Sequence, residues 1–171
     1  MVQVTENQDN PKFKAETLKE VERIIAQYPE GKQKSGLLRI LHIAQEEFGG
    51  WLSVSTMNYV AEILSIKPIE VYEVASFYSM YNLKPVGKFV LEFCHTATCA
   101  SSGVESLIDY TCTKLGIKSG QTTPDRLFTV KEVECLGACG YAPMLQLGKS
   151  YREHLTPEKI DALIDELKAK G

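Results

Sequence analysis

Apolar residues in the first half of the chain recur at intervals of three and four positions, which is the spacing of one face of an α-helix. The pattern predicts a first helix that Pro29 ends, a second that Gly49-Gly50 ends, a third that follows Ser55, and a fourth with Pro68 in its first turn. The apolar faces of these helices hold, in chain order, Phe13, Leu18, Val21, Ile24, Ile25 and Tyr28; Leu37, Leu38, Ile40, Leu41, Ala44 and Phe48; Met57, Val60, Ala61 and Leu64; and Val71, Val74, Ala75 and Tyr78. Four short helices of this kind predict a small bundle.

The pattern changes after residue 85, where short apolar runs replace the helical spacing. Ser102 to Glu105 matches a capping box and opens a predicted helix that Gly116 ends. Thr156 is the expected cap of a last helix with Pro157 in its first turn. Three apolar runs predict strands, and a glycine predicts a turn after the third: 89–93, 127–134, 144–147, and the turn at 148–149.

The two patterns divide the chain. We expect a flexible N-terminus at residues 1–12, a helical bundle at 13–85 and a mixed domain of strands and helices at 86–171. The predicted fold class is therefore α/β (α+β), with a small N-terminal helical bundle in front of an α/β layer. No internal repeat or low-complexity segment is present in the sequence.

The composition is that of an ordinary folded protein, and it excludes several classes of partner. The 171 residues are 44% hydrophobic, which suffices for one large domain or two compact units. With 19 Lys and Arg against 22 Asp and Glu, the net charge is -3, so we expect no nucleic-acid partner. No run approaches the roughly 20 apolar residues of a membrane helix, and the polar N-terminus has no apolar signal core. These features predict a cytoplasmic protein without direct membrane insertion.

Four of the five cysteines form two pairs in loops that follow predicted strands. Cys94 and Cys99 stand in C-H-T-A-T-C, and Cys135 and Cys139 stand in C-L-G-A-C. In a reducing compartment, clustered cysteines bind metal or do redox chemistry more often than they form disulfides. Four thiolates are the ligand set of a 2Fe-2S cluster, and two per loop match one iron per loop if each pair shares an iron. Small residues in both loops allow backbone N–H groups to approach the sulfur atoms.

Other interpretations of the two pairs remain open at this point. Structural zinc usually takes C-x2-C, but spacings up to C-x4-C are tolerated, and four buried thiols can also simply pack in a core. A Rieske centre needs two Cys-His pairs and a c-type haem needs C-x-x-C-H, and neither motif is present. The C-x-x-C of a thioredoxin-type dithiol is also absent.

The remaining cysteine and the histidines receive mostly structural interpretations. Cys112 lies four residues after Ile108 on a predicted apolar helix face, which favours a buried, inert thiol over a fifth ligand. For His95, donation to a cluster sulfur and simple exposure to solvent are equally open. His42 is interpreted as a packing or hydrogen-bonded helix residue, and His154 as a surface residue.

The chain offers no catalytic site of its own. Core packing at the junction of the two units is a better interpretation of the aromatic run than a cofactor site; the run comprises Phe77, Tyr78, Met80 and Tyr81. The sequence contains no Ser-His-Asp set, glycine-rich phosphate loop or acidic dyad. We therefore predict no catalytic residues on this chain.

Over roughly residues 15 to 168 the sequence resembles the thioredoxin-like 2Fe-2S subunits of the NADH-oxidising module of respiratory complex I, the family of the NADH:quinone oxidoreductase E subunit. The cluster segments and their flanks together are specific, whereas either cysteine pair alone is weak evidence. The segments that carry the resemblance are Tyr28-Pro29, LLRILHIAQEEFGGWLS, VYEVASFYSMYNLKPVGK, FCHTATC, VECLGACGYAPM and YREHLTPEKIDAL.

The resemblance implies a thioredoxin-like 2Fe-2S ferredoxin domain behind the helical bundle, with one cluster per chain on Cys94, Cys99, Cys135 and Cys139. It implies that the bundle binds a flavoprotein subunit that carries FMN and NADH, and that the cluster exchanges one electron with that flavin. The enzyme would be the NADH dehydrogenase assembly, peripheral on the cytoplasmic side of the inner membrane. Related subunits serve NAD-linked hydrogenases and formate dehydrogenases, and a free thioredoxin-like ferredoxin or a zinc-stabilised interaction module remain alternatives.

Overall fold

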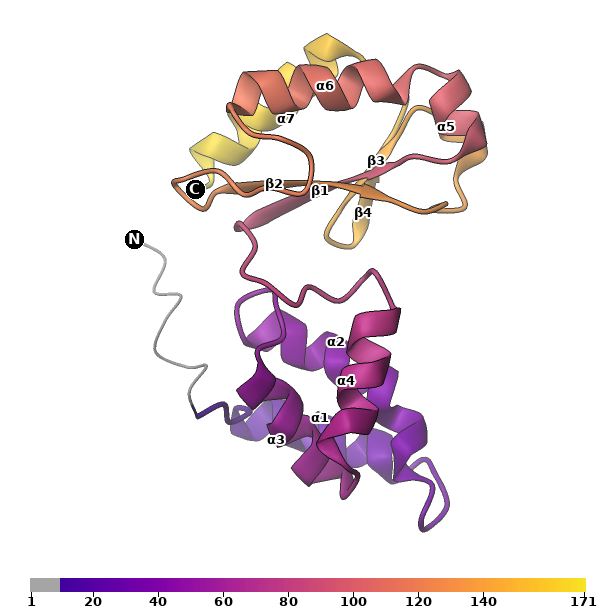
Figure 1. Ribbon diagram of the computed structural model, residues 1–171, viewed down its shortest axis with the longest axis vertical. Helices are drawn as coiled ribbons and strands as arrows, with labels where there is room; N and C mark the ends of the chain where they lie inside the picture. The colour runs from indigo at the N-terminus through magenta and orange to yellow at the C-terminus, as the bar shows by residue number, and fades with distance from the viewer. Residues whose placement is uncertain (1–9) are drawn as a thin grey trace. The chain divides into compact units, whose positions relative to one another are not determined.

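The computed structural model describes residues 10–171, and the chain divides into two compact units at Pro85 and Val86 (Figure 1). Residues 1–9 of the predicted flexible N-terminus lie outside the described residues. Within the described part of the chain, no helix is both long enough and apolar enough to cross a membrane. The structure is a mixed α/β fold, as predicted from the change of pattern along the sequence.

The first unit contains the four predicted helices. They are α1 (Ala15–Ile25), α2 (Leu37–Glu47), α3 (Val54–Leu64) and α4 (Pro68–Phe77), with a short 3-10 turn η1 (Gln33–Gly36) before α2. Their buried residues coincide with most of the predicted apolar faces; Val21, Ile40, Leu41 and Val60 are all inaccessible to solvent. The third helix begins earlier than predicted, because the Ser53 hydroxyl accepts a hydrogen bond from the Thr56 amide at 3.0 Å and caps α3.

The chain after α4 departs from the prediction of core packing for its aromatic run. Only Tyr81 is buried, with 4% of its surface exposed, and its hydroxyl donates to the carbonyl of Leu38 at 2.7 Å. Phe77 is 80% exposed, and Tyr78 and Met80 are also exposed. Tyr78 lies beyond the last residue of α4, so it does not continue the apolar face of that helix.

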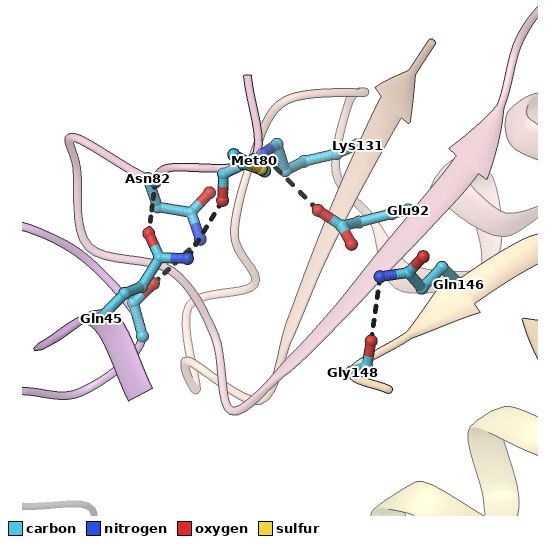
Figure 2. Close-up of polar contacts among 8 residues, drawn as sticks. Gln45, Met80, Asn82, Glu92, Lys131, Gln146 and Gly148 are labelled. Atoms are coloured by element: carbon cyan, nitrogen blue, oxygen red, sulfur yellow. Dashed lines mark hydrogen bonds and ion pairs between the residues drawn. The ribbon is translucent and has the colours of Figure 1, made fainter. Parts of the chain in front are cut away.

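One glutamine side chain holds the segment after α4 against α2, as Figure 2 shows. Gln45 donates from Nε2 to the Met80 carbonyl at 3.0 Å and accepts at Oε1 from the Asn82 amide at 2.6 Å. Asn82 in turn donates from Nδ2 to the Gly50 carbonyl at 2.9 Å, and the Leu52 amide donates to the Asn82 carbonyl. These bonds fix the backbone just after the exposed aromatic residues.

The second unit is a four-stranded sheet covered by helices. Strands β1 (Phe89–Cys94), β2 (Phe128–Val133), β3 (Leu145–Leu147) and β4 (Ser150–Arg152) are ordered β2-β1-β3-β4; β1 and β2 are parallel and the other neighbours antiparallel. Helices α6 (Val104–Leu115) and α7 (Pro157–Ala169) lie on the same face of the sheet (Figure 1). Their core with the sheet includes Leu91, Phe93, Val130, Leu145 and Ile164.

The opposite face of the sheet carries polar side chains. Glu92 of β1 pairs in register with Lys131 of β2, and their charged groups lie 3.8 Å apart (Figure 2). Gln146 of β3 is also in register with Glu92, and its side chain donates to the Gly148 carbonyl at 3.0 Å. Tyr151 of β4 pairs with Gln146, so its side chain belongs to this same face.

Short elements were not predicted in this unit, and the cap predicted at Ser102 is wrong. Helix α5 (Ala97–Ser101) and strand β4 are absent from the sequence prediction. The hydroxyl of Ser102 donates to the Thr98 carbonyl and caps nothing; α6 begins instead after Gly103, whose φ is +85°. Two other signals in this unit are confirmed: Gly116 ends α6, and the Thr156 hydroxyl accepts from the Lys159 amide at the start of α7. In the first unit, α1 ends at Ile25, before the predicted end at Pro29.

Candidate metal centre

Both cysteine pairs lie in loops that follow the carboxyl ends of neighbouring strands. Cys94 is the last residue of β1, and Cys135 follows the end of β2 at Val133. The two strands are parallel and Cys94 is in register with Val133, so their carboxyl ends meet at one edge. The His95 amide donates to the Val133 carbonyl at 2.9 Å and extends this pairing by one step. The predicted placement of both loops at strand ends is thus confirmed.

The first pair is buried. Cys94 and Cys99 expose 3% and 2% of their surfaces, and Cys99 lies on α5. The thiols lie within hydrogen-bonding reach of each other, and the Thr96 hydroxyl lies 3.4 Å from Cys94 Sγ. Burial opposes ionisation of Cys94, but hydrogen bonds from the side chain and backbone of Thr96 and from the backbone of Leu136 outweigh it and lower the pKa of Cys94 to about 7.

The second pair is exposed. Cys135 lies in a loop without regular structure, and Cys139 begins the 3-10 turn η2 (Cys139–Tyr141). The Gly137 amide lies 3.4 Å from Cys135 Sγ and donates to it. Gly137 has a φ of +74°, a left-handed conformation that side chains disfavour, and this turns its amide back toward the preceding cysteine.

The two loops contact each other through sulfur. The Leu136 backbone, which belongs to the second loop, hydrogen-bonds Cys94 of the first. Burial and the neighbouring Cys94 thiol raise the pKa of Cys99 to about 11, a hydrogen bond from the Met144 backbone opposes this, and charge on Cys139 adds to the rise. Cys94, Cys99 and Cys139 are therefore close enough to affect one another's ionisation.

This arrangement fits the donor set of a two-iron cluster. Within residues 10–171, no group of three or more His, Cys, Asp or Glu side chains is placed to hold a single metal ion. The chain instead presents four free thiols as two pairs on facing loops, with backbone N–H groups directed at the sulfurs. A 2Fe-2S core takes four thiolates and is stabilised by such donors.

Cys112 lies outside this site. It is buried on α6, and burial, followed by the charges of Asp109 and Glu132, raises the pKa of its thiol. All five cysteines are free, so no disulfide constrains either pair. The prediction of a buried thiol is confirmed.

His95 is exposed to solvent, which is one of the two roles considered from sequence alone. Its side chain lies between two carboxylates, with Nε2 3.3 Å from Glu105 Oε1 and Nδ1 3.7 Å from Glu132 Oε2. Of the other histidines, His42 packs against the ring of Tyr81 and His154 against the ring of Tyr141. None of these contacts involves a cysteine.

Several groups at the site were not recognised in the sequence. The backbone amides of Leu136 and Met144 act on the first cysteine pair although neither residue type signals a ligand site. The Tyr151 hydroxyl donates to the Leu136 carbonyl at 2.8 Å from a strand that was not predicted. The Ala142–Pro143 peptide bond, between the second cysteine loop and β3, is cis.

Comparison with known proteins gives consistent matches. The family model of the thioredoxin-like [2Fe-2S] ferredoxins matches residues 21–168. The NADH-quinone oxidoreductase E subunit of Rickettsia bellii is 43% identical over 159 residues, which cover 93% of this chain and 95% of the relative. NADH dehydrogenase [ubiquinone] flavoprotein 2, mitochondrial, of Dictyostelium discoideum is 42% identical over 91% of this chain and 63% of its own length.

The fold also matches a solved enzyme. The air-oxidised NAD+-reducing [NiFe]-hydrogenase superposes with a TM-score of 0.69 at 27% identity over 79% of this chain. The matched region is 23% of that hydrogenase chain, so the similarity concerns one part of a longer polypeptide.

Proposed function

Because the chain belongs to the thioredoxin-like [2Fe-2S] ferredoxin family, we propose that Cys94, Cys99, Cys135 and Cys139 hold one 2Fe-2S cluster and that the chain is an electron-transfer subunit. The observation that carries the proposal is that both cysteine pairs follow the paired parallel strands β1 and β2, where Cys94 is in register with Val133 and the His95 amide donates to the Val133 carbonyl at 2.9 Å. When bound, the cluster supplies a one-electron redox centre.

The two cysteine pairs and the hydrogen bonds to their sulfur atoms have different roles around that centre. The buried first pair excludes water from one side of the site, and the exposed second pair leaves the other side open toward a partner. Hydrogen bonds to Cys94 and Cys135 stabilise negative charge on sulfur. Such bonds favour thiolate ligands, and they favour the more negative, reduced form of the cluster.

The cluster is tested by chemical analysis of the purified full-length chain. We expect iron and acid-labile sulfide in a one-to-one ratio and two of each per chain. A colourless protein with stoichiometric zinc would refute the cluster and favour a zinc-stabilised interaction module. In that case electron transfer by this chain would be excluded as well.

The parent assembly is an NADH:quinone oxidoreductase. The relatives that carry the name of its E subunit are 41–45% identical to this chain over most of their length. A chain with a one-electron centre and no substrate site needs a partner that exchanges electrons with the substrate. We assign this role to a flavoprotein subunit that binds FMN and NADH, with the cluster beside the flavin.

The helical unit is the proposed docking element for that partner. Five large apolar side chains are exposed on α4 and just after it; we call them the exposed α4 residues, and they are Ile69, Tyr72, Phe77, Tyr78 and Met80. Exposed apolar side chains gathered on one stretch of chain are typical of protein–protein interfaces, and aromatic residues and Met are enriched there. A free ferredoxin has no need of such an element.

The equivalent position in an NAD-linked hydrogenase is the second candidate, and the superposition on the NAD+-reducing [NiFe]-hydrogenase favours it specifically. Affinity purification of the tagged chain from its native cell separates the two. We expect a flavoprotein together with quinone-reducing subunits, with the complex on the cytoplasmic side of the inner membrane. Recovery of nickel-containing subunits in their place would favour the hydrogenase.

A further inference from the structure

The hydroxyl of Tyr151 reaches from β4 to the loop that carries the second cysteine pair. Tyr151 is 43% exposed on the sheet face opposite α6 and α7, and its Oη lies 2.8 Å from the carbonyl oxygen of Leu136. A carbonyl can only accept, so the tyrosine hydroxyl is the donor of this bond. The sheet edge is thereby tied to the middle of the cysteine loop.

The Leu136–Gly137 peptide connects this hydroxyl to a cysteine sulfur. Its carbonyl accepts from Tyr151, and its N–H, which belongs to Gly137, donates to Cys135 Sγ at 3.4 Å. The carbonyl and the N–H of one trans peptide are coplanar and point in opposite directions, so fixing the first aims the second. The O–H, the peptide and the sulfur form one chain in which each hydrogen bond polarises the next.

The Leu136 side chain packs against the core of the second unit, whereas the Gly137 side of this peptide has no such packing. Gly137 has a left-handed φ of +74°, and no heavy atom beyond its two chain neighbours lies within 4 Å of the position that a Cβ would occupy. Glycine also has the widest conformational freedom of any residue. The Leu136 amide, one peptide earlier, interacts with Cys94, so a shift of this segment would disturb donors to both cysteine pairs.

We propose that Tyr151 is a positioning residue for the cluster, whose hydroxyl holds the Leu136–Gly137 peptide so that its N–H donates to the Cys135 sulfur and raises the midpoint potential. This inference rests on the proposed 2Fe-2S cluster. Hydrogen bonds to the sulfur ligands are among the factors that set the potential of such clusters, and they stabilise the reduced state more than the oxidised state. Loss of the hydroxyl therefore makes reduction harder.

The test is an EPR-monitored redox titration of the cluster-loaded full chain as wild type, Tyr151→Phe and Tyr141→Phe. Tyr141 is the matched control, because it is an exposed tyrosine two residues after Cys139 whose ring contacts His154. We expect Tyr151→Phe to lower the ratio of reduced to oxidised cluster about threefold at a fixed potential, which is about 30 mV for a one-electron couple. Tyr141→Phe should have the same midpoint potential as the wild type.

A loaded Tyr151→Phe protein with the wild-type midpoint would overturn the proposal. If this variant is isolated without its cluster, site-specific 3-fluorotyrosine at position 151 decides instead, because fluorine makes the phenol a stronger donor without removing it. A more positive midpoint then supports the proposal, and an unchanged or more negative midpoint refutes it. Absence of iron and sulfide from the wild type would refute the proposed function itself, which separates the two failures.

Discussion

The four thiols of the candidate site differ sharply in environment. Hydrogen bonds outweigh the effect of burial at Cys94 and lower its pKa to about 7, whereas burial and the adjacent Cys94 raise the pKa of Cys99 to about 11. The Cys94 thiol therefore ionises more readily than the Cys99 thiol. The second pair is exposed and accessible to incoming iron.

Serine substitution separates ligand cysteines from packing cysteines. We expect Cys135→Ser to lose the cluster or change its optical spectrum strongly, because a thiolate donor is removed from the set of four. Cys112→Ser is the matched control: it places a hydroxyl in a buried position and should cost about 1 kcal/mol of stability while keeping the cluster. Visible absorption and iron content check both. A normal spectrum for Cys135→Ser would contradict the ligand assignment.

The raised pKa of Tyr81 predicts that the stability of the helical unit depends on pH. Burial, followed by the charge of Tyr78, raises the pKa of Tyr81 to about 12 from its ordinary value of 10. Because the folded state binds this proton more tightly, the contribution to stability is complete below pH 10 and is lost as the pH rises from 10 to 12.

Tyr81→Phe should remove this dependence. At pH 8 the free energy of unfolding of the variant should be about 1 kcal/mol lower than that of the wild type, because the hydrogen bond to the Leu38 carbonyl is lost. Urea unfolding followed by circular dichroism at pH 8, 10 and 11.5 checks this. We expect the difference from the wild type to shrink as the pH rises, and a constant difference would contradict the role given to the Tyr81 proton.

At the scale of elements, Gln45 joins α2 to the segment after α4. Its amide makes two hydrogen bonds to the backbone at Met80 and Asn82. Gln45→Ala should lower the free energy of unfolding by about 1–2 kcal/mol, since both backbone partners lose a neutral hydrogen bond. Gln27→Ala, an exposed change at the end of α1, should stay within about 0.5 kcal/mol of the wild type. Equal values for the two variants would show that the glutamine does not hold this segment.

Sequence pattern predicted the long elements and failed at the short ones. Helices of ten or more residues show several repeats of their apolar spacing, as α2 and α7 do, whereas α5 and β4 are too short to show a period. The cap signal at Ser102 failed because its hydroxyl bonds the preceding turn at Thr98. Ser53 and Ser55 are both good caps, and only the three-dimensional path of the chain selects Ser53.

The local features of the candidate site were predictable from the sequence, and its contacts between distant residues were not. The four cysteines and their strand ends follow from motif and period, because a ligand pair and its strand are local in sequence. The bond from Tyr151 to Leu136 spans 15 residues and depends on the register of the β3–β4 hairpin, which the sequence does not specify. The exposure of Phe77 was missed because an apolar side chain by itself does not tell a core from an interface.

At the scale of the whole molecule, the proposed function requires the helical unit to bind a partner. Phe77 is 80% exposed and its ring packs against that of Tyr78, an arrangement typical of an interface anchor. Phe77→Ser should weaken binding of the flavoprotein subunit at least tenfold, by about 1.4–2 kcal/mol, with little change in unfolding. Surface plasmon resonance or co-purification measures this.

The control for that experiment lies in the same unit. Val54 is 66% exposed as the first residue of α3 and is not one of the exposed α4 residues, so Val54→Ser should leave the affinity unchanged. Equal loss in both variants would indicate general destabilisation of the bundle. If Phe77→Ser binds with the wild-type affinity, the docking surface lies elsewhere on the chain.

The central claim is that this chain carries one redox-active 2Fe-2S cluster on two facing loops. The most direct measurement is EPR spin quantification of the dithionite-reduced full-length chain, with iron, sulfide and zinc determined on the same sample. We expect one unpaired electron per chain at two irons and two sulfides, and a diamagnetic oxidised state. A sample that contains zinc, or that stays EPR-silent after reduction with iron present, would contradict the claim.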